Sequence, residues 1–184
     1  MEYCQNGDLQ KYIDKMRQEN KIINENNFFD FAAQIASGLS LIHGRKIIHR
    51  DLKPANIFLS GQGRLKIGDF GLSKVIDEKD YAHTVAGTRS YLSPEILNKW
   101  SYTEKVDMWS FGICLYILAE LTHPFDTKNE ISLVTSIVQQ QPAPFVNLKN
   151  QVAQNLIISL LSKDSAKRPN ADDILQIPEI AIQH

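Results

Sequence analysis

The sequence predicts a mainly α-helical domain that carries one small β-hairpin. Apolar residues recur at helical spacing over residues 28–42, and residues 106–121 are apolar almost all round, which indicates a central buried helix. Two short β-prone runs, residues 57–59 and 65–67, flank the turn-forming stretch SGQGR, which is typical of a β-hairpin. These three patterns favour a helical body with a small β element on it.

Length and charge narrow the class of protein. The chain has 184 residues, a mass of 20.9 kDa and 43% hydrophobic residues, enough for one sizeable core. Twenty Lys and Arg against 21 Asp and Glu disfavour nucleic acid as the chief partner, because phosphate backbones attract basic surfaces. Two cysteines fit a reducing compartment, and the longest apolar stretch, 111–121, is too short to cross a membrane. We therefore expect a cytoplasmic chain without a membrane partner; the oligomeric state stays open.

The first part of the chain is predicted to form two helices followed by short strands. Residues 8–17 predict a short helix, and the second helix, over residues 28–42, has Asn27 as its expected N-cap and Gly44 as its stop. A β-prone run at 46–48 precedes the hairpin.

The rest of the chain reads as a long loop followed by helices. Residues 69–94 show no sustained period, and long loops in compact domains are usually functional. Apolar spacing then predicts the following helices: residues 106–121, 131–139, 152–161 and 171–176.

Residues 49–56 (HRDLKPAN) concentrate chemically active groups beside a predicted strand. Eighteen positions after Asp51 comes Asp69, which opens the tripeptide DFG directly after the second strand of the hairpin. The hairpin should bring Asn56 and Asp69 close together, so that two oxygen donors lie on one wall. Such hard oxygen donors suit Mg²⁺, which prefers one or two carboxylates together with phosphate oxygens.

The order of these motifs resembles the signature of protein kinases. The chain contains the catalytic loop H-R-D-L-x-x-x-N, then D-F-G, then a variant of A-P-E as residues 93–95 (SPE). Lys53-Pro54 and Gly87-Thr88 look like the Ser/Thr branch, and residues 1–9 (MEYCQNGDL) are similar to the NIMA-related (Nek) kinases. The resemblance covers essentially the whole chain, although Arg89 stands where many relatives have proline.

This resemblance implies transfer of the γ-phosphoryl group of Mg·ATP to a Ser or Thr hydroxyl of a protein. Asp51 would accept the proton of the attacking hydroxyl, and Lys53 would offset charge on the transferred group. Asn56 and Asp69 would bind Mg²⁺ and thereby contact ATP. Thr88 would help to shape the substrate shelf, by which we mean residues 87–95.

The same resemblance implies the floor of the adenine site. The backbones of Glu2 and Cys4 would meet the adenine, Phe58 would lie under it, and Asp8 would approach the ribose.

Other residues are expected to have structural roles. The resemblance implies a buried ion pair between Glu95 and Arg168, and it makes Asp107 an anchor for the backbone of the catalytic loop. His49 and Phe70 are interpreted as packing residues.

The resemblance also implies that part of a kinase is missing from this sequence. No G-x-G-x-x-G can be built from its nine glycines, and no V-A-I-K-like lysine is present. We therefore expect residues 1–184 to form a partial kinase domain: the C-terminal lobe from the hinge onward, without the N-terminal lobe and inactive by itself.

Two other functions compete with this interpretation. The chain could be a lone lobe that acts as a protein-binding module, or a small-molecule phosphotransferase of kinase-like fold. The intact set of catalytic-loop and metal residues favours the kinase. In the complete kinase, Thr84 is the expected activating phosphosite, with Arg50 as the guanidinium that a phosphate could engage.

Overall fold

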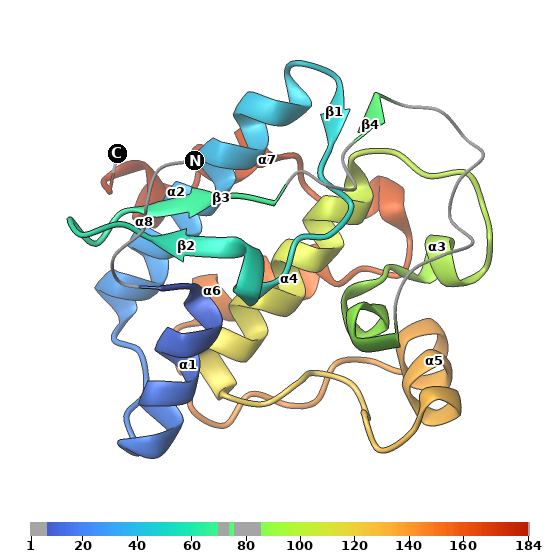
Figure 1. Cartoon of the computed structure of the whole chain (residues 1–184), viewed down its shortest axis with the longest axis horizontal. Helices are drawn as coiled ribbons and strands as arrows, with labels where there is room; N and C mark the ends of the chain where they lie inside the picture. The colour runs from blue at the N-terminus through green and yellow to red at the C-terminus, as the bar shows by residue number, and fades with distance from the viewer. Residues whose placement is uncertain (1–6, 70–73, 76–85, 184) are drawn as a thin grey trace.

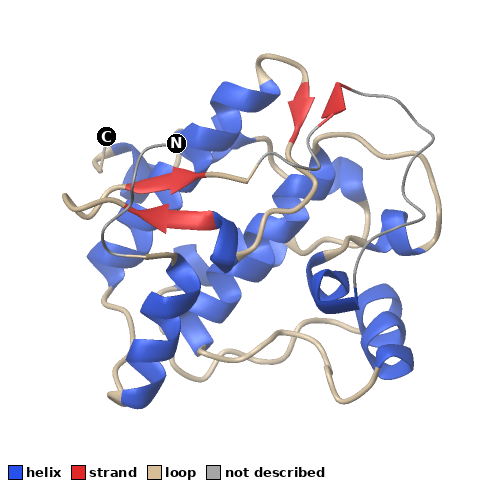
Figure 2. Cartoon of the chain, viewed as in Figure 1, coloured by secondary structure: helices blue, strands red, loops and turns tan. Residues whose placement is uncertain are grey.

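The structure is a computed structural model that describes residues 7–69, 74–75 and 86–183. Figures 1 and 2 show a body made mostly of helices, with two separate pairs of short strands, one at the left and one at the top. Within these residues, no helix is both long and apolar enough to cross a membrane. The predicted mainly α-helical architecture with a small β-hairpin is confirmed.

The first two helices begin at polar side chains that cap them. Helix α1 (Leu9–Gln18) starts after Asp8, whose Oδ1 accepts a hydrogen bond of 2.9 Å from the backbone N–H of Lys11. Helix α2 (Glu25–His43) starts after Asn24 and ends at Gly44. The prediction of Asn27 as the N-cap was wrong: its backbone N–H donates to Asn24 Oδ1, so the helix begins one turn earlier.

Helix α4 (Lys105–Glu120) forms the centre of the molecule, and in Figure 1 it runs diagonally through the middle. Every residue from Val106 to its end is buried, as the all-round apolar pattern predicts. Gly112 lets helix α6 (Gln151–Leu160) approach closely, because a Cβ at this position would lie 2.8 Å from the Cβ of Leu160.

Two small antiparallel sheets accompany the helices. Strand β2 (Ile57–Leu59) pairs with β3 (Leu65–Ile67), and strand β1 (Ile47–Ile48) pairs with β4 (Lys74–Val75). The hairpin β2–β3 lies against α1 and α2, and the 3₁₀ turn η1 (Pro54–Asn56) leads into it. The hairpin is therefore as predicted, whereas β4 lies in a segment that we expected to be loop.

The remaining elements complete the helical body. Helices α5 (Glu130–Gln139), α6 and α7 (Ala171–Leu175) agree with the predicted positions to within a residue or two. Besides η1 and β4, four short elements were not predicted: α3 (Pro94–Leu97), α8 (Pro178–Ala181), η3 (Ala86–Tyr91) and η4 (Ser165–Lys167). One buried apolar cluster joins α1, α2, α4, α6, α7 and α8, so these helices share a core.

Candidate active site

Asp107, in the first turn of α4, anchors the backbone of the catalytic loop (residues 49–56). Its carboxylate accepts hydrogen bonds from the N–H groups of His49 and Arg50, both at 2.8 Å, and from Nε2 of His43, also at 2.8 Å. The side chain of Asp107 is 1% exposed, and a helix N-terminus stabilises a buried carboxylate. Arg50 has a positive φ of 70°, a conformation uncommon for a residue with a side chain. The expected anchoring contact is therefore present.

The carboxylate of Asp51 accepts hydrogen bonds from two side chains of its own loop. Its Oδ2 accepts hydrogen bonds from Lys53 Nζ at 2.8 Å and from Asn56 Nδ2 at 3.0 Å. Asn56 Nδ2 also donates to the backbone oxygen of Asp51, at 2.8 Å. Asp51 Oδ1 is buried and has no hydrogen-bond partner among the described residues. A buried oxygen without a partner is costly, and such groups often belong to a site that a ligand completes.

The hairpin places Asn56 and Asp69 at the same end of two paired strands. Ile57 is in register with Ile67, and the N–H of Gly68 donates to the backbone oxygen of Asn56 at 2.9 Å. Asp69 follows at once, exposed and with a φ of 58°. Because Asn56 Nδ2 donates to Asp51, the amide oxygen of Asn56 points away from Asp51.

This donor set fits a magnesium ion that also binds phosphate. One carboxylate and one amide oxygen are hard ligands, and Mg²⁺ commonly takes few protein ligands beside water and substrate phosphates. Across the part of the chain that the structure describes, no group of three or more His, Cys, Asp or Glu side chains could hold a metal. A site made by protein alone is therefore less suitable here than one completed by a nucleotide.

His49 does more than the packing that we predicted. The ring is fully buried; its Nε2 lies 2.9 Å from the backbone oxygen of Gly68, and its Nδ1 accepts from the N–H of Asp51 at 3.3 Å. With these partners, Nε2 is the donor and Nδ1 is the acceptor. His49 thus links the catalytic loop to the residue before Asp69. Its position two residues before Asp51 places it beside the site, but the sequence does not distinguish these hydrogen bonds from packing.

The expected adenine floor is described in part. Phe58 is half-buried, and its ring lies so close to Gly68 that a Cβ there would be 2.7 Å from it. Asp8 forms a β-bridge with Phe58, but its carboxylate caps α1, with Lys11 Nζ at 4.0 Å. Glu2, Cys4 and Phe70 lie outside the described residues. The structure therefore brings Asp8 and Phe58 together and leaves the other expected contacts untested.

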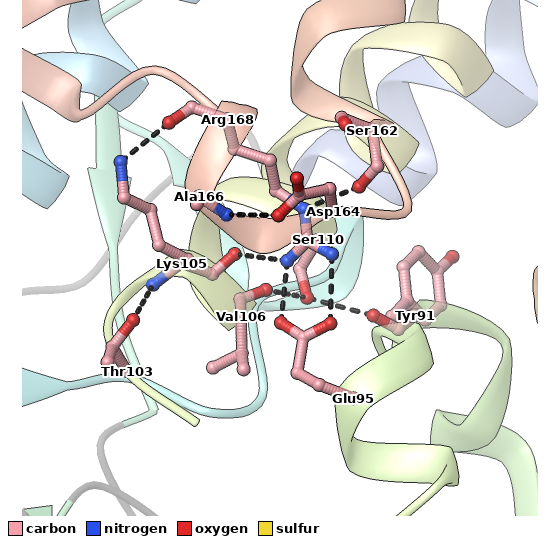
Figure 3. Close-up of polar contacts among 10 residues, drawn as sticks. All are labelled: Tyr91, Glu95, Thr103, Lys105, Val106, Ser110, Ser162, Asp164, Ala166 and Arg168. Atoms are coloured by element: carbon pink, nitrogen blue, oxygen red, sulfur yellow. Dashed lines mark hydrogen bonds and ion pairs between the residues drawn. The ribbon is translucent and has the colours of Figure 1, made fainter. Parts of the chain in front are cut away.

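The end of the substrate shelf is held by a buried ion pair, shown in Figure 3. Arg168 donates from Nη1 and Nη2 to the two carboxylate oxygens of Glu95, at 2.6 and 2.8 Å. The expected pair is present, and Arg168 also donates to the backbone oxygens of Ser162 and Lys105. Ser110 Oγ donates to the backbone oxygen of Tyr91 at 2.9 Å, which ties the shelf to α4. Thr84 and the side chain of Thr88 lie outside the described residues.

Comparisons with known proteins agree with this geometry. The family model described as "Protein kinase domain" matches residues 1–179. The chain is 38% identical over 95% of its length to the probable serine/threonine-protein kinase nek2 of Dictyostelium discoideum, covering 43% of that protein. It is 42% identical over 97% of its length to human Nek5, covering 25% of it, and 35% identical over 98% to human Nek2, covering 42%.

The chain spans less than half of the length of these relatives. The family match, however, extends over almost all of its residues, and the motifs of the catalytic loop, the hairpin and the shelf occur in the order that the family requires. The chain therefore belongs to the protein kinase domain family and is similar within it to the Nek serine/threonine kinases.

Proposed function

We propose that residues 1–184 are the larger, helical lobe of a serine/threonine protein kinase domain, from the hinge onward. The whole enzyme would transfer the γ-phosphoryl group of ATP to a Ser or Thr hydroxyl of a protein. The observation that carries this proposal is the arrangement at Asp51: Lys53 and Asn56 hold one carboxylate oxygen, and the other is buried without a partner among the described residues.

In this proposal, Asp51 accepts the proton of the acceptor hydroxyl. Oδ1 supplies the acceptor, since Oδ2 already receives two hydrogen bonds. Lys53 places a positive charge 2.8 Å from the same carboxylate, where it can also stabilise charge that develops on the transferred group. Asp107 fixes the start of the loop that carries Asp51 and Lys53, through the N–H groups of His49 and Arg50.

Asn56 and Asp69 are the residues that would hold Mg²⁺ with the phosphates of ATP. When bound, the ion supplies charge neutralisation on the phosphate oxygens. Phe58 would support the adenine, and Glu2, Cys4 and Asp8 would complete the nucleotide contacts. For Asp8 this requires the carboxylate to serve the ribose while it caps α1, which its second oxygen permits.

The sequence of this chain supplies neither a glycine-rich phosphate loop nor a phosphate-clamping lysine. Loss of a single preorganised electrostatic donor typically costs about 10²–10³ in rate. We therefore propose that the 184-residue chain alone transfers very little phosphate.

One experiment tests the function and this inactivity together. The chain is assayed alone, and also after joining its first residue to the glycine-rich, lysine-bearing segment of a Nek relative, which we call the joined enzyme. We expect the joined enzyme to phosphorylate a generic Ser/Thr protein substrate and the chain alone to be inactive. A joined enzyme that phosphorylates only compounds from a small-molecule panel would exclude the protein kinase.

Thr84 is the proposed activating phosphosite, although it lies outside the described residues. Arg50 supports this proposal: its backbone is fixed by Asp107, and its guanidinium carbon lies 5.5 Å from the ring centroid of Tyr102. A guanidinium fixed in this way can engage a phosphate bidentately. In the joined enzyme, Thr84→Ala should prevent activation by phosphorylation; unchanged activation with phosphate mapped to Ser73, Tyr81 or Ser90 would contradict it.

A further inference from the structure

His123 lies in the segment between α4 and α5, and its ring joins that segment to the substrate shelf. Its Nε2 is 3.0 Å from the backbone oxygen of Ser90, in the shelf. Its Nδ1 accepts a hydrogen bond of 3.1 Å from the N–H of Phe125. One ring thus bridges two segments that are far apart in the sequence.

The two partners determine which ring nitrogen carries the proton. Nε2 faces the carbonyl of Ser90, so it must be the donor, and the lone pair of Nδ1 then receives the N–H of Phe125. The oxygen of Phe125 is also 3.1 Å from Nδ1, but it would be a partner only for a protonated Nδ1. Burial lowers the pKa of His123, which keeps the ring neutral at pH 7.

His123 is itself supported by residues that pack on the buried helix α4. Phe125 stacks on Trp109 of α4, with ring centroids 5.6 Å apart and planes 4° apart, and Trp109 is fully buried. The ring of Tyr91 meets His123 edge-on at 6.2 Å, while the backbone oxygen of Tyr91 is held by Ser110. The backbone oxygens of two consecutive shelf residues are therefore fixed by side chains from outside the shelf.

We propose that His123 is a positioning residue for the peptide substrate. By holding the carbonyl of Ser90, it keeps the backbone of the substrate shelf in the orientation that receives a peptide with a Ser or Thr acceptor. This inference rests on the proposed kinase function. His123 touches neither the acceptor nor the nucleotide; it acts only through the shelf.

Two matched substitutions separate this role from simple packing. The amide nitrogen of Gln reaches the place of Nε2, so His123→Gln keeps a donor for Ser90. The amide of Asn reaches only the place of Nδ1, so His123→Asn keeps a partner for Phe125 and loses the bond to Ser90. Both variants replace the ring by a smaller amide and each loses one of the two hydrogen bonds, so a loss of peptide binding in His123→Asn alone assigns the effect to the bond with the shelf.

The test measures binding of a Ser-containing peptide to the 184-residue chain by NMR titration, with Kd as the readout. One hydrogen bond predicts that His123→Asn weakens binding about three- to tenfold, whereas His123→Gln stays close to wild type. Nitrogen-15 NMR of the wild-type imidazole should show the proton on Nε2. In the joined enzyme, His123→Asn should raise the KM for peptide and leave the KM for ATP unchanged.

Several results would overturn the proposal: equal effects of Asn and Gln, a proton on Nδ1, or a wild-type chain that binds no peptide. A joined enzyme that transfers no phosphate would instead refute the proposed function. In that case, the ring tautomer and the peptide affinities still decide the role of His123.

Discussion

The carboxylate of Asp51 uses its two oxygens differently, since Oδ2 is occupied by Lys53 and Asn56 while Oδ1 has no partner among the described residues. Asp69, by contrast, is exposed at the end of a strand. The two aspartates therefore stand in different surroundings, and neutralising them should have different effects.

In the joined enzyme, Asp51→Asn and Asp69→Asn should both remove most turnover, by about 10²–10⁴-fold for Asp51 as a proton acceptor. Asp51→Asn should leave the affinity for Mg·ATP nearly intact. Asp69→Asn removes a full charge from the proposed magnesium site, so it should weaken nucleotide binding only when Mg²⁺ is present.

The measurements are nucleotide affinity with and without Mg²⁺, and single-turnover transfer. If either variant kept transfer near the wild-type rate, the role given to that aspartate would be wrong, and it would be merely a turn residue, since Asn replaces Asp well in turns.

Lys163 is half-buried against two aromatic rings of the core. Its Nζ lies 4.2 Å from the ring centroid of Phe125 and 4.8 Å from that of Trp109, and it donates to the backbone oxygen of Ile137 at 2.6 Å. Burial, followed by the nearby charge of Arg168, lowers the pKa of Lys163 to about 8. In the unfolded chain this pKa returns to its ordinary value of 10.5.

Stability should therefore depend on pH through Lys163. Between pH 8 and 10.5 the unfolded chain holds a proton that the folded chain has lost, so the contribution of this group to stability rises with pH. The difference in free energy of unfolding between wild type and Lys163→Met should increase in favour of wild type over this window. Urea unfolding at several pH values measures it, with Lys167→Met as the exposed control. A difference independent of pH would show that the pKa is not lowered.

The resemblance to the kinase signature named some residues of the candidate site and missed others. The catalytic loop and Asp69 could be named because their residue types and order are specific. The hydrogen bonds of His49 could not, since an interior histidine looks the same in sequence whether it only packs or also bonds at both nitrogens. His43 was missed for the same reason, because its partner Asp107 is far away in the chain.

At the scale of elements, the pair Glu95–Arg168 joins α3 to the segment before α7. Arg168 is 1% exposed and Glu95 is 5% exposed, so removal of one partner leaves the other charge buried. Glu95→Gln should lower the free energy of unfolding by about 3–5 kcal/mol.

The exposed pair Lys15–Glu19 is the control for this prediction. Lys15 lies in α1 and Glu19 directly follows this helix, and Lys15 Nζ is 3.9 Å from Glu19 Oε1. Lys15→Gln should cost much less than Glu95→Gln, because solvent screens a surface pair. Urea denaturation of both variants provides the comparison. Similar losses in the two variants would mean that Arg168 finds other acceptors when Glu95 is neutralised.

Elements were predictable where they are long enough to show a period. The helices with at least ten residues were all predicted, but α4 was recognised by a long run that is apolar on every side rather than by a period, as expected of a helix that is buried all round. Helices α3 and α8 have only four residues each, which is little more than one turn. Strand β4 has two residues and exists through its partner β1, so tertiary pairing determines it rather than local sequence.

At the scale of the whole molecule, the described helices share one core around α4, which predicts a single cooperative unfolding transition. Trp109 is fully buried in this core, whereas Trp100 is 63% exposed. Trp100→Phe therefore leaves a fluorescence signal that reports only on the core. Its urea transition should coincide with the loss of helical circular dichroism. Two separated transitions would show that part of the helical body unfolds independently.

The hydrogen bonds that Asp107 accepts should also slow the exchange of two amide hydrogens with solvent. The amide hydrogens of His49 and Arg50 belong to a loop, yet both are bound by a carboxylate on α4, the most buried of the described helices. They can exchange with solvent deuterium only when α4 loosens, which requires the core to open. Deuterium should therefore enter these two catalytic-loop positions as slowly as it enters the middle of α4. The backbone of the catalytic loop would therefore keep its geometry for as long as the core stays folded.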